Sequence, residues 1–531
     1  MIVDGRSDTS PSLPEYDLVI VGSGPAGTTV AHELVGSGLR IAVLESGGLE
    51  FDGDTQELYD GAVTGLDEVD LMAIRLRMLG GTSNHWGGNC LPLDNIDFER
   101  APLSGMTGWP FNRATLMPFY ERAHPYLDLG AVDYDTYAPR GVSAGNLLLP
   151  DNPVVDNAVL RISANPPTRF GEKYRPLYET EQTIDLWLWT NLVGLNISPS
   201  GQVTGIETAT LLGQTRQFKA KRVVLACGAV ENARQLMLAN LRNGTSFGDS
   251  GGFLGTCYMD HPTGGSGFVW PHEALNDKVN WAQDLVSADG TDMRYVWRLH
   301  EDVLERERLS NAQFYVIPYS SDSSVRQRKR DAWQGYQGLK SLAKWTLNRE
   351  GHNFSLSRSY CNFITNADAM AGEYLFPRGA VNRMLLKYET EQQPDKASRI
   401  TLTETQDRLG LPLPNLHWSP SEDDRQSVIR TTELIGQAVG AADLGRLAFE
   451  DGRDERYWNM VTSWHQLGTT RMSVAPSDGV VNENALVHGT QNLFVAGGSI
   501  MPTGGRANPT LTITALSIRL ADHLRTEGSR G

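Results

Sequence analysis

The sequence predicts a mixed α/β fold whose central parallel sheet is assembled from separated stretches of the chain. An apolar run at residues 16–22 is followed by a helical pattern at 26–34 and a second apolar run at 40–44. Apolar runs of the same kind return at 222–228 and 492–496, and glycine ends or follows each of them. Because buried strands of parallel sheets have continuous apolar sequences, these runs predict one sheet built from three parts of the chain.

The first strand-to-helix turn carries the spacing G-x-G-x-x-G, formed by Gly22, Gly24 and Gly27. The first glycine permits a tight turn, the second lets a pyrophosphate approach the backbone, and the third allows close packing of helix on strand. Phosphate charge is stabilised at the N-terminus of the helix that follows. Glu45 ends the second strand, at the distance where a carboxylate receives ribose hydroxyls. Together these features predict an adenine dinucleotide site.

A second set of signals lies near the C-terminal end of the chain. His465 and Asn508 flank the apolar run at 492–496, and Pro509 opens a helix-patterned stretch. Asn508 therefore occupies the position expected for a helix N-cap. A neutral histidine accepts protons near neutral pH, and a helix N-terminus stabilises negative charge. The pattern predicts a site that removes a proton and a hydride from an alcohol. The simpler alternatives are that Asn508 only caps the helix and that His465 is only a buried, hydrogen-bonded side chain.

The returning strand at 492–496 favours FAD over NAD as the dinucleotide. Its terminal glycines let the backbone approach the ribityl chain of a flavin, whereas nicotinamide enzymes do not need such a strand far along the sequence. The sequence therefore predicts a flavoprotein.

On these residues the chain resembles the glucose–methanol–choline (GMC) oxidoreductase family of flavoenzymes over nearly its whole length. The matching segments are VIVGSGPAGTTVAHEL with LESGG, GGTSNHWGG, GWPF, VVLACGAVENARQLM, MDHP, and the C-terminal block that contains WHQLGTTRM and NPTLTITAL. The GGTSNHWGG loop is most similar to those of the pyranose oxidases, fructose dehydrogenases and aminoglycoside-modifying oxidases. The resemblance implies a discontinuous Rossmann-like FAD-binding domain and a smaller α+β substrate domain whose antiparallel-type sheet covers the flavin.

The resemblance and a change in sequence texture after about residue 262 set the expected domain boundaries. A strand entered through a proline turn is expected at 391–404, and helical spacing is seen at 423–440. The expected parts are a flexible tail at 1–15, an FAD-binding domain at 16–110, 186–262 and 455–531, and a substrate-binding domain with cap segments at 111–185 and 263–454.

The resemblance also implies the roles of individual residues. Family members carry a histidine followed by a histidine or asparagine at the catalytic positions, which assigns His465 as the base and Asn508 as the second partner of the substrate oxygen. No metal site is expected. The residues expected to contact FAD are Gly22, Gly24, Pro25, Ala26, Gly27, Glu45, Ser46, Gly80, Gly81, Thr82, Asn84, His85, Trp86, Gly87, Gly88, Val193, Ala226, Gly228, Gly497, Asn508, Pro509 and Thr510.

His85 raises the question of a covalent link. In the pyranose oxidases the histidine of a similar S-x-H-W loop is attached to the flavin, and Ser83 to Trp86 fit that pattern. Gly87 and Gly88 follow, as in relatives that hold FAD without a bond. The sequence leaves both arrangements open, with a slight preference for non-covalent binding.

Composition narrows the classes of partner. The net charge of −16 argues against nucleic acid and anionic membrane surfaces as partners. No apolar run approaches the length that spans a membrane, and the polar first residues do not resemble a signal peptide. Four cysteines without C-x-x-C or metal-ligand spacing suit reduced thiols, so a cytoplasmic location is expected. The negative field would attract a cationic amino sugar, although solubility alone accounts for it.

The expected function is FAD-dependent oxidation of an alcohol group of a sugar, glycoside or similar polyol to an aldehyde or ketone. Oxygen, a quinone or another acceptor would take the electrons. One alternative within the enzymes is oxidation of the primary 6′-type alcohol of an aminoglycoside. Alternatives of another class are a non-redox lyase and a flavin-binding partner subunit on the same fold. The sequence leaves the oligomeric state open.

Overall fold

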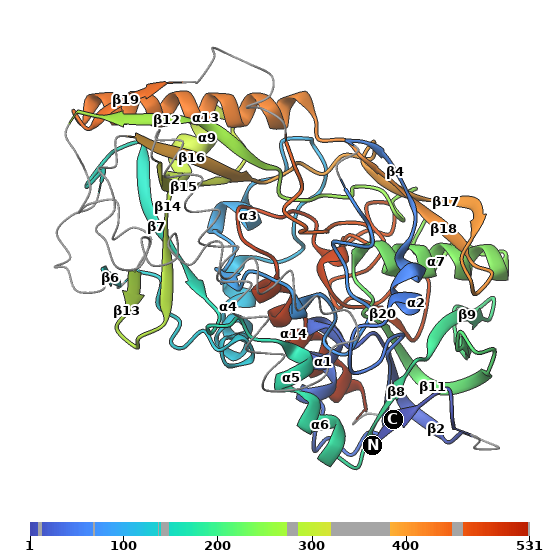
Figure 1. Cartoon of the computed structure of the whole chain (residues 1–531). Helices are drawn as coiled ribbons and strands as arrows, with labels where there is room; N and C mark the ends of the chain where they lie inside the picture. The colour runs from blue at the N-terminus through green and yellow to red at the C-terminus, as the bar shows by residue number, and fades with distance from the viewer. Residues whose placement is uncertain are drawn as a thin grey trace, which may run out of the picture.

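The computed structural model of the chain describes residues 1–8, 13–66, 69–135, 137–139, 148–272, 285–319, 383–448 and 460–528. These residues form three sheets, with a largely parallel sheet and an antiparallel sheet at opposite ends of the molecule (Figure 1). In this part of the chain, none of the helices combines the length and the apolarity needed to cross a bilayer.

The first sheet has a parallel core extended by two antiparallel strands. Its strands, in spatial order, are β1 (Ile2–Asp4), β8 (Ile184–Leu188), β3 (Ile41–Leu44), β2 (Glu15–Val21), β11 (Thr215–Leu225), β10 (Val203–Ala209) and β9 (Asn191–Ile197). A further strand, β20 (Leu493–Val495), pairs in parallel with the end of β11. The strand pairings thus bring the three separated apolar regions into one sheet, as the sequence predicts. The residues of β3 and β20 are all buried, in agreement with their continuous apolar character.

Helices lie between the strands of this sheet along the chain. The long ones are α1 (Pro25–Glu33), α7 (Ala229–Asn243), α14 (Thr510–Gly528) and α4 (Arg113–Ala123). α14 packs against both α1 and α4, and the three lie together in Figure 1. Two short helices, α5 (Phe170–Lys173) and α6 (Arg175–Thr180), precede β8.

The N-terminal segment differs from the flexible tail expected at 1–15. Ile2–Asp4 form β1, which pairs in parallel with β8, and the amide of Gly5 donates to the Leu188 carbonyl at 3.0 Å. The apolar pair Ile2 and Val3 packs against the core, where the edge of the sheet leaves backbone groups free to pair. A strand this short carries too little periodicity to be recognised from sequence.

The second sheet is antiparallel throughout its described strands, which confirms the expected type. Its order is β19 (Gly445–Ala448), β12 (Thr263–Pro271), β16 (Arg383–Thr390), β15 (Ala312–Tyr319), β14 (Asp292–Leu299), β13 (Leu285–Ser287) and β6 (Tyr137–Pro139), and β7 (Val155–Ile162) joins β14 to β5 (Asn89–Cys90). The helix α13 (Glu422–Ala441) packs on β12 and β19, as Figure 1 shows, and α9 (Glu301–Glu307) connects β14 to β15. The Ser421 side chain begins α13 with a capping box.

A third, three-stranded sheet lies beside α7. It consists of β17 (Arg399–Gln406), β18 (Pro412–Trp418) and β4 (Ala62–Gly65). The remaining short helices are α2 (Gly53–Gln56), α3 (Asn95–Glu99), η1 (Glu57–Tyr59), η2 (Gly81–Asn84), η3 (His124–Leu127) and η6 (Gly498–Ile500). The boundary expected between residues 185 and 186 falls inside β8, and α4 of the expected cap segment packs on α14.

Candidate active site

A cavity of about 730 Å³ lies between the largely parallel sheet and the antiparallel sheet, and residues from both regions line it. Its wall includes the turns after β2, β3, β11 and β20, the loop from Ile74 to Asn89, the N-terminus of α14, and side chains of β14, β15 and β16. We call the part lined by Gly22 and Gly24 the glycine end and the part lined by His465 and Asn508 the histidine end.

The three glycines of the fingerprint meet different surroundings at the glycine end. A Cβ atom on Gly22 would lie 2.5 Å from the Ala226 carbonyl oxygen, and one on Gly27 would lie 2.0 Å from the Gly22 carbonyl oxygen. A Cβ atom on Gly24 would meet no protein atom within 4 Å, although Gly24 lines the cavity. Two glycines therefore allow close backbone packing, and the middle one leaves room for a ligand beside the N-terminus of α1.

Glu45 is held in one orientation at the end of β3. One carboxylate oxygen accepts hydrogen bonds from the backbone amide of Ser23 at 3.1 Å and its hydroxyl at 2.5 Å, and the other accepts from the Gly47 amide at 2.9 Å. The side chain is 5% exposed and lines the cavity. Such a fixed carboxylate suits the ribose hydroxyls of a dinucleotide.

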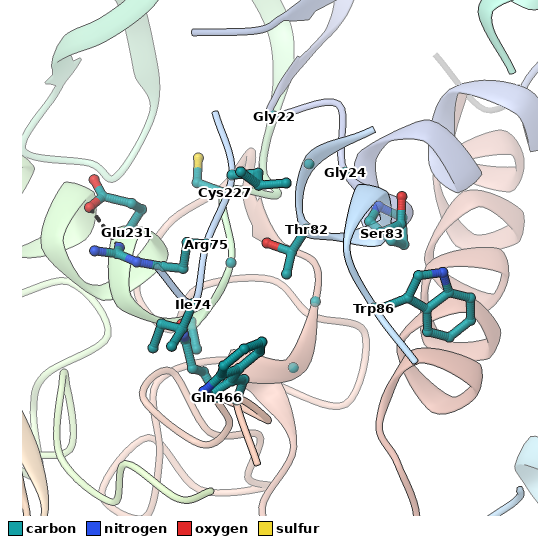
Figure 2. A pocket seen from close by; sticks show the side chains of 18 of the residues that line it. Gly22, Gly24, Ile74, Arg75, Thr82, Ser83, Trp86, Cys227, Glu231 and Gln466 are labelled. Atoms are coloured by element: carbon teal, nitrogen blue, oxygen red, sulfur yellow. Dashed lines mark hydrogen bonds and ion pairs between the residues drawn. The ribbon is translucent and has the colours of Figure 1, made fainter. Parts of the chain in front are cut away.

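A buried network of charges forms one wall of the glycine end. Glu231 contacts Arg75 at 3.2 Å, Arg77 at 3.5 Å and Arg234 at 3.2 Å, and Arg234 also pairs with Asp407 at 2.7 Å. Burial acts to raise the pKa of Glu231, but the three guanidinium groups outweigh it and lower this pKa to about 2. Glu231 and Arg234 stand three residues apart on α7, and the other two arginines come from the loop that contains Ile74. In Figure 2, Arg75 and Glu231 lie on one side of the cavity, and Trp86 lies on the other.

The glycine-rich loop turns tightly through η2 and is fixed by its own polar groups. Gly80 has a φ of 86°, and a Cβ atom there would lie 2.1 Å from the Gly171 amide nitrogen, so only glycine fits. Asn84 donates to the Leu79 carbonyl at 2.9 Å and the Gly81 carbonyl at 2.8 Å. Asn84 therefore shapes the loop without lining the cavity.

His85 reaches the cavity at the end of this loop. Its ring lies edge-on to the ring of Trp464 at 5.9 Å, and burial lowers its pKa. Its Nε2 atom is buried and has no hydrogen-bond partner in the structure. A buried polar atom without a partner is costly, so this nitrogen marks a place where a ligand group fits.

Four polar side chains from three regions of the chain meet at the histidine end. His465 Nδ1 lies 3.1 Å from His261 Nδ1 and 3.3 Å from a Glu389 oxygen, and its Nε2 lies 3.3 Å from the Asn508 amide nitrogen. The Asn508 amide also donates to Glu389 at 3.3 Å. The carboxylate of Asp260 accepts from the backbone amides of His261 at 2.7 Å and His465 at 3.0 Å, which joins the two histidine segments.

The contacts of His261 fix which nitrogen of His465 carries the proton. His261 Nε2 lies 2.9 Å from the Gly505 carbonyl oxygen, which only accepts, so in the neutral ring Nε2 carries the hydrogen. Nδ1 of His261 is then an acceptor, and His465 Nδ1 donates to it. The lone pair of His465 is therefore on Nε2, beside Asn508 in the cavity.

Electrostatics favour a neutral His465 beside an ionised Glu389. Burial is the main cause that lowers the pKa of His465, and the neighbouring Glu389 acts in the opposite direction without overcoming it. Burial acts to raise the pKa of Glu389, yet the two histidines and hydrogen bonds from Gln313 and Tyr315 leave it below its ordinary value. A neutral imidazole whose Nε2 carries no hydrogen can accept a proton.

Asn508 does not serve as a side-chain cap, which corrects the simpler alternative for this residue. Its amide nitrogen is directed to Glu389 and His465, and its Oδ1 atom is buried without any hydrogen-bond partner in the structure. The residue is 7% exposed and lines the cavity. Its oxygen therefore remains available to a group that enters the cavity.

Most of the expected contact residues line the cavity, and four do not. Gly27 and Gly80 act through backbone packing, and Asn84 acts through the loop. Val193 does not line the cavity, to which β9 contributes Asn191 and Leu192. The expected residues that line it are Gly22, Gly24, Pro25, Ala26, Glu45, Ser46, Gly81, Thr82, His85, Trp86, Gly87, Gly88, Ala226, Gly228, His465, Gly497, Asn508, Pro509 and Thr510.

The sequence motifs assign no place to Arg506 or Glu389, two buried charged residues. Arg506 is 4% exposed and pairs with Asp94 at 2.7 Å, away from the cavity lining, so it supports the fold. Glu389 belongs to no motif, and only the pairing of β16 with β15 reveals its place. His261 belongs to the MDHP segment, and its side chain contacts His465.

The chain is similar to several known proteins. Residues 394–517 match the family model for GMC oxidoreductase. The chain is 24% identical to a 2-methyl-1,2-propanediol dehydrogenase of Mycolicibacterium austroafricanum, over 97% of this chain and 96% of that protein. It is 23% identical to a paromamine 6′-oxidase of Streptomyces fradiae, over 97% and 92%.

Among solved structures, a formate oxidase of Aspergillus oryzae has a similar fold, with a TM-score of 0.56 and 17% identity over 98% of this chain and 100% of that one. The C-terminal part of the chain therefore matches the GMC oxidoreductase family, and the whole chain is similar to the two relatives above. The matched family is one of oxidoreductases, and the two relatives are named as a dehydrogenase and an oxidase.

Proposed function

We propose that the protein oxidises an alcohol group of a sugar, glycoside or similar polyol to an aldehyde or ketone. The observation that carries the proposal is the meeting of His465 Nε2 and the Asn508 amide, 3.3 Å apart, in the cavity that the dinucleotide fingerprint also lines. A base and a hydrogen-bonding amide at one point are what removal of a hydroxyl proton requires.

The fit of FAD rests on vacant space and unsatisfied polar atoms. Gly24 leaves open space at the N-terminus of α1, and Glu45 presents a fixed carboxylate one strand away. At the other end, His85 Nε2 and Asn508 Oδ1 are buried without partners. These features suit a molecule that is charged at one end and carries hydrogen-bonding ring atoms at the other.

In the proposed reaction His465 Nε2 accepts the hydroxyl proton of the substrate. Asn508 holds the substrate oxygen, and His261 and Glu389 keep the imidazole oriented through Nδ1. A bound flavin would supply the acceptor for the hydride, which leaves the carbon that bears the hydroxyl group. Loss of one proton from oxygen and one hydride from carbon leaves a carbonyl group. The N-terminus of α14, at Pro509 and Thr510, directs its positive end into the cavity, where it stabilises developing negative charge.

Anaerobic bleaching of the bound flavin tests this function. Sugars, glycosides, linear polyols and aminoglycosides are added to the yellow protein without oxygen, and bleaching by at least one class is expected. Oxygen, a quinone or a dye is then added to identify the acceptor from the return of the yellow band. Turnover of a substrate with the flavin band unchanged would identify a lyase, and no effect of any alcohol would favour a partner subunit.

A second candidate substrate is an aminoglycoside with a primary 6′-type alcohol. The similarity to a paromamine 6′-oxidase over 97% of the chain favours it, as does the net charge of −16. The same panel decides between the candidates, because neutral polyols and amino sugars are compared at equal concentration.

We propose that FAD is held without a covalent bond, in line with Gly87 and Gly88 after Trp86. After acid precipitation the yellow colour is expected in the supernatant. A yellow pellet that fades in the variant His85→Ala would instead identify a tether through His85. We also propose the domain boundaries expected from the sequence, except that the boundary between residues 185 and 186 falls inside β8.

A further inference from the structure

Two cations of the antiparallel sheet face the cavity near the histidine end. Arg294 is on β14 and Lys387 is on β16, and both line the cavity. Lys387 is directly opposite Tyr315 of the intervening β15, and the Arg294 guanidinium lies over the Tyr315 ring at 6.0 Å from its centroid. Alternation along β16 places Lys387 and Glu389 on the same face, roughly 7 Å apart along the strand.

Neither cation is neutralised by a residue that the structure describes. Among the residues that the structure describes, no hydrogen bond or ion pair reaches the side chain of Arg294 or Lys387, whereas Arg298 on the same strand pairs with Asp94 at 3.0 Å and Asp156 at 2.8 Å. The pair also contrasts with the glycine end, where guanidinium groups and carboxylates contact one another.

The carboxylate on this face is already engaged. Glu389 accepts hydrogen bonds from Gln313 at 2.9 Å and Tyr315 at 2.8 Å, in addition to its contacts with His465 and Asn508. Burial and Glu389 raise the pKa of Tyr315 well above its ordinary value, so its hydroxyl remains a donor to that carboxylate. Glu389 thus serves the histidine end, and within the described ranges no other carboxylate pairs with the two cations.

We propose that the alcohol oxidised by this protein carries an anionic group, a carboxylate or a phosphate, which Arg294 and Lys387 bind. The inference rests on the proposed function for the oxidation and adds the substrate class. Arg294 offers a planar set of N–H donors suited to either anion, and Lys387 adds a point charge. An acid group on one side of a sugar ring and the reacting hydroxyl on the other would match the separation between Lys387 and Glu389.

The proposal opposes the aminoglycoside candidate, although the net charge of −16 would draw cations toward the molecule. The field of the whole protein acts on the approach of a ligand, whereas these two groups act on its bound position. An ammonium group held beside Arg294 and Lys387 would be repelled by two like charges.

Four compounds with the same hexose ring test the inference on the FAD-containing protein. Glucose is neutral, glucosamine is cationic, glucuronate carries a carboxylate, and glucose 6-phosphate carries a phosphate. Binding is measured without oxygen from the perturbation of the oxidised flavin spectrum, and reduction is followed separately by bleaching. We expect glucuronate or glucose 6-phosphate to bind about 10-fold or more tightly than glucose, and glucosamine to bind most weakly. Tighter binding of glucuronate identifies a carboxylate as the bound anion, and tighter binding of glucose 6-phosphate identifies a phosphate.

Variants tie that preference to the two cations. Lys387→Gln and Arg294→Gln should each abolish most of the preference for the anionic compound while leaving glucose binding within about 2-fold, since neutral hydroxyls gain little from either charge. Lys219→Gln is the matched control, because Lys219 is exposed on β11 and does not line the cavity. FAD content and the unfolding temperature identify any variant that fails to fold.

The binding measurement tests the anion site, and the reduction measurement tests the proposed oxidation, so either proposal can be wrong without the other. If no alcohol bleaches the flavin but the anions bind through Arg294 and Lys387, the anion site stands and the proposed oxidation is wrong. If the wild-type protein binds glucuronate and glucose 6-phosphate no more tightly than glucose, or if neither Gln variant weakens them, the anion site is wrong, whatever the flavin does.

Discussion

The two ends of the cavity are built in different ways. At the glycine end, backbone packs closely around Gly22 and Gly27, and the charges of Glu231, Arg75 and Arg234 contact one another. At the histidine end, His85 and Asn508 each have a buried polar atom without a partner. The difference teaches that satisfied contacts hold a cofactor in place, whereas unsatisfied groups are kept for molecules that react there.

The glycine end can be disrupted by one methyl group without damage to the fold. Gly24→Ala should cause the largest loss, because the new Cβ meets no protein atom but enters the space for the pyrophosphate. The purified variant should retain little FAD, measured from its absorption spectrum, while its apo-protein unfolds at the same temperature as wild-type apo-protein. Gly27→Ala is the matched control, since its Cβ would lie 2.0 Å from the Gly22 carbonyl oxygen and should lower the unfolding temperature itself. Full FAD content in Gly24→Ala would contradict the placement of the dinucleotide.

The histidine end should respond to loss of orientation with FAD still bound. His261→Phe removes the acceptor for His465 Nδ1 and should lower the rate of flavin reduction by about 10- to 100-fold, as other orienting groups do. His261→Gln keeps a donor and an acceptor and should recover part of the rate. His417→Phe, on β18 outside the cavity lining, is the control. Stopped-flow reduction is the measurement, and a wild-type rate in His261→Phe would show that the tautomer needs no such partner.

The smallest effect concerns pH. His465 must be neutral to accept a proton, and burial lowers its pKa, so the protonated form appears only at more acidic pH. Flavin reduction should therefore stay constant at neutral pH and fall only below about pH 6.5, the ordinary imidazole value. Reduction rates across a pH series, at saturating substrate, measure this. A fall that begins above the ordinary value would mean that Glu389 outweighs burial.

The two ends of the cavity also differ in how much of each could be predicted from the sequence. The glycine end depends on contiguous motifs, so the glycines, Glu45 and the strands around them were predictable from local spacing. His465 and Asn508 were predictable because each stands in a distinctive local segment.

The remaining part of the histidine end was hidden for a physical reason. Arg294, Lys387 and Glu389 belong to strands without motifs, and the register of the sheet alone decides which face they occupy. Strand β1 was too short for a periodic signal.

The central claim is that His465 is the base for alcohol oxidation in a cavity that holds FAD. Anaerobic stopped-flow reduction of His465→Ala by the best alcohol found for the wild-type protein tests it most directly. The variant should bind FAD with an unchanged spectrum and be reduced about 10²- to 10⁴-fold more slowly. Reduction at the wild-type rate, with FAD in place, would contradict the account.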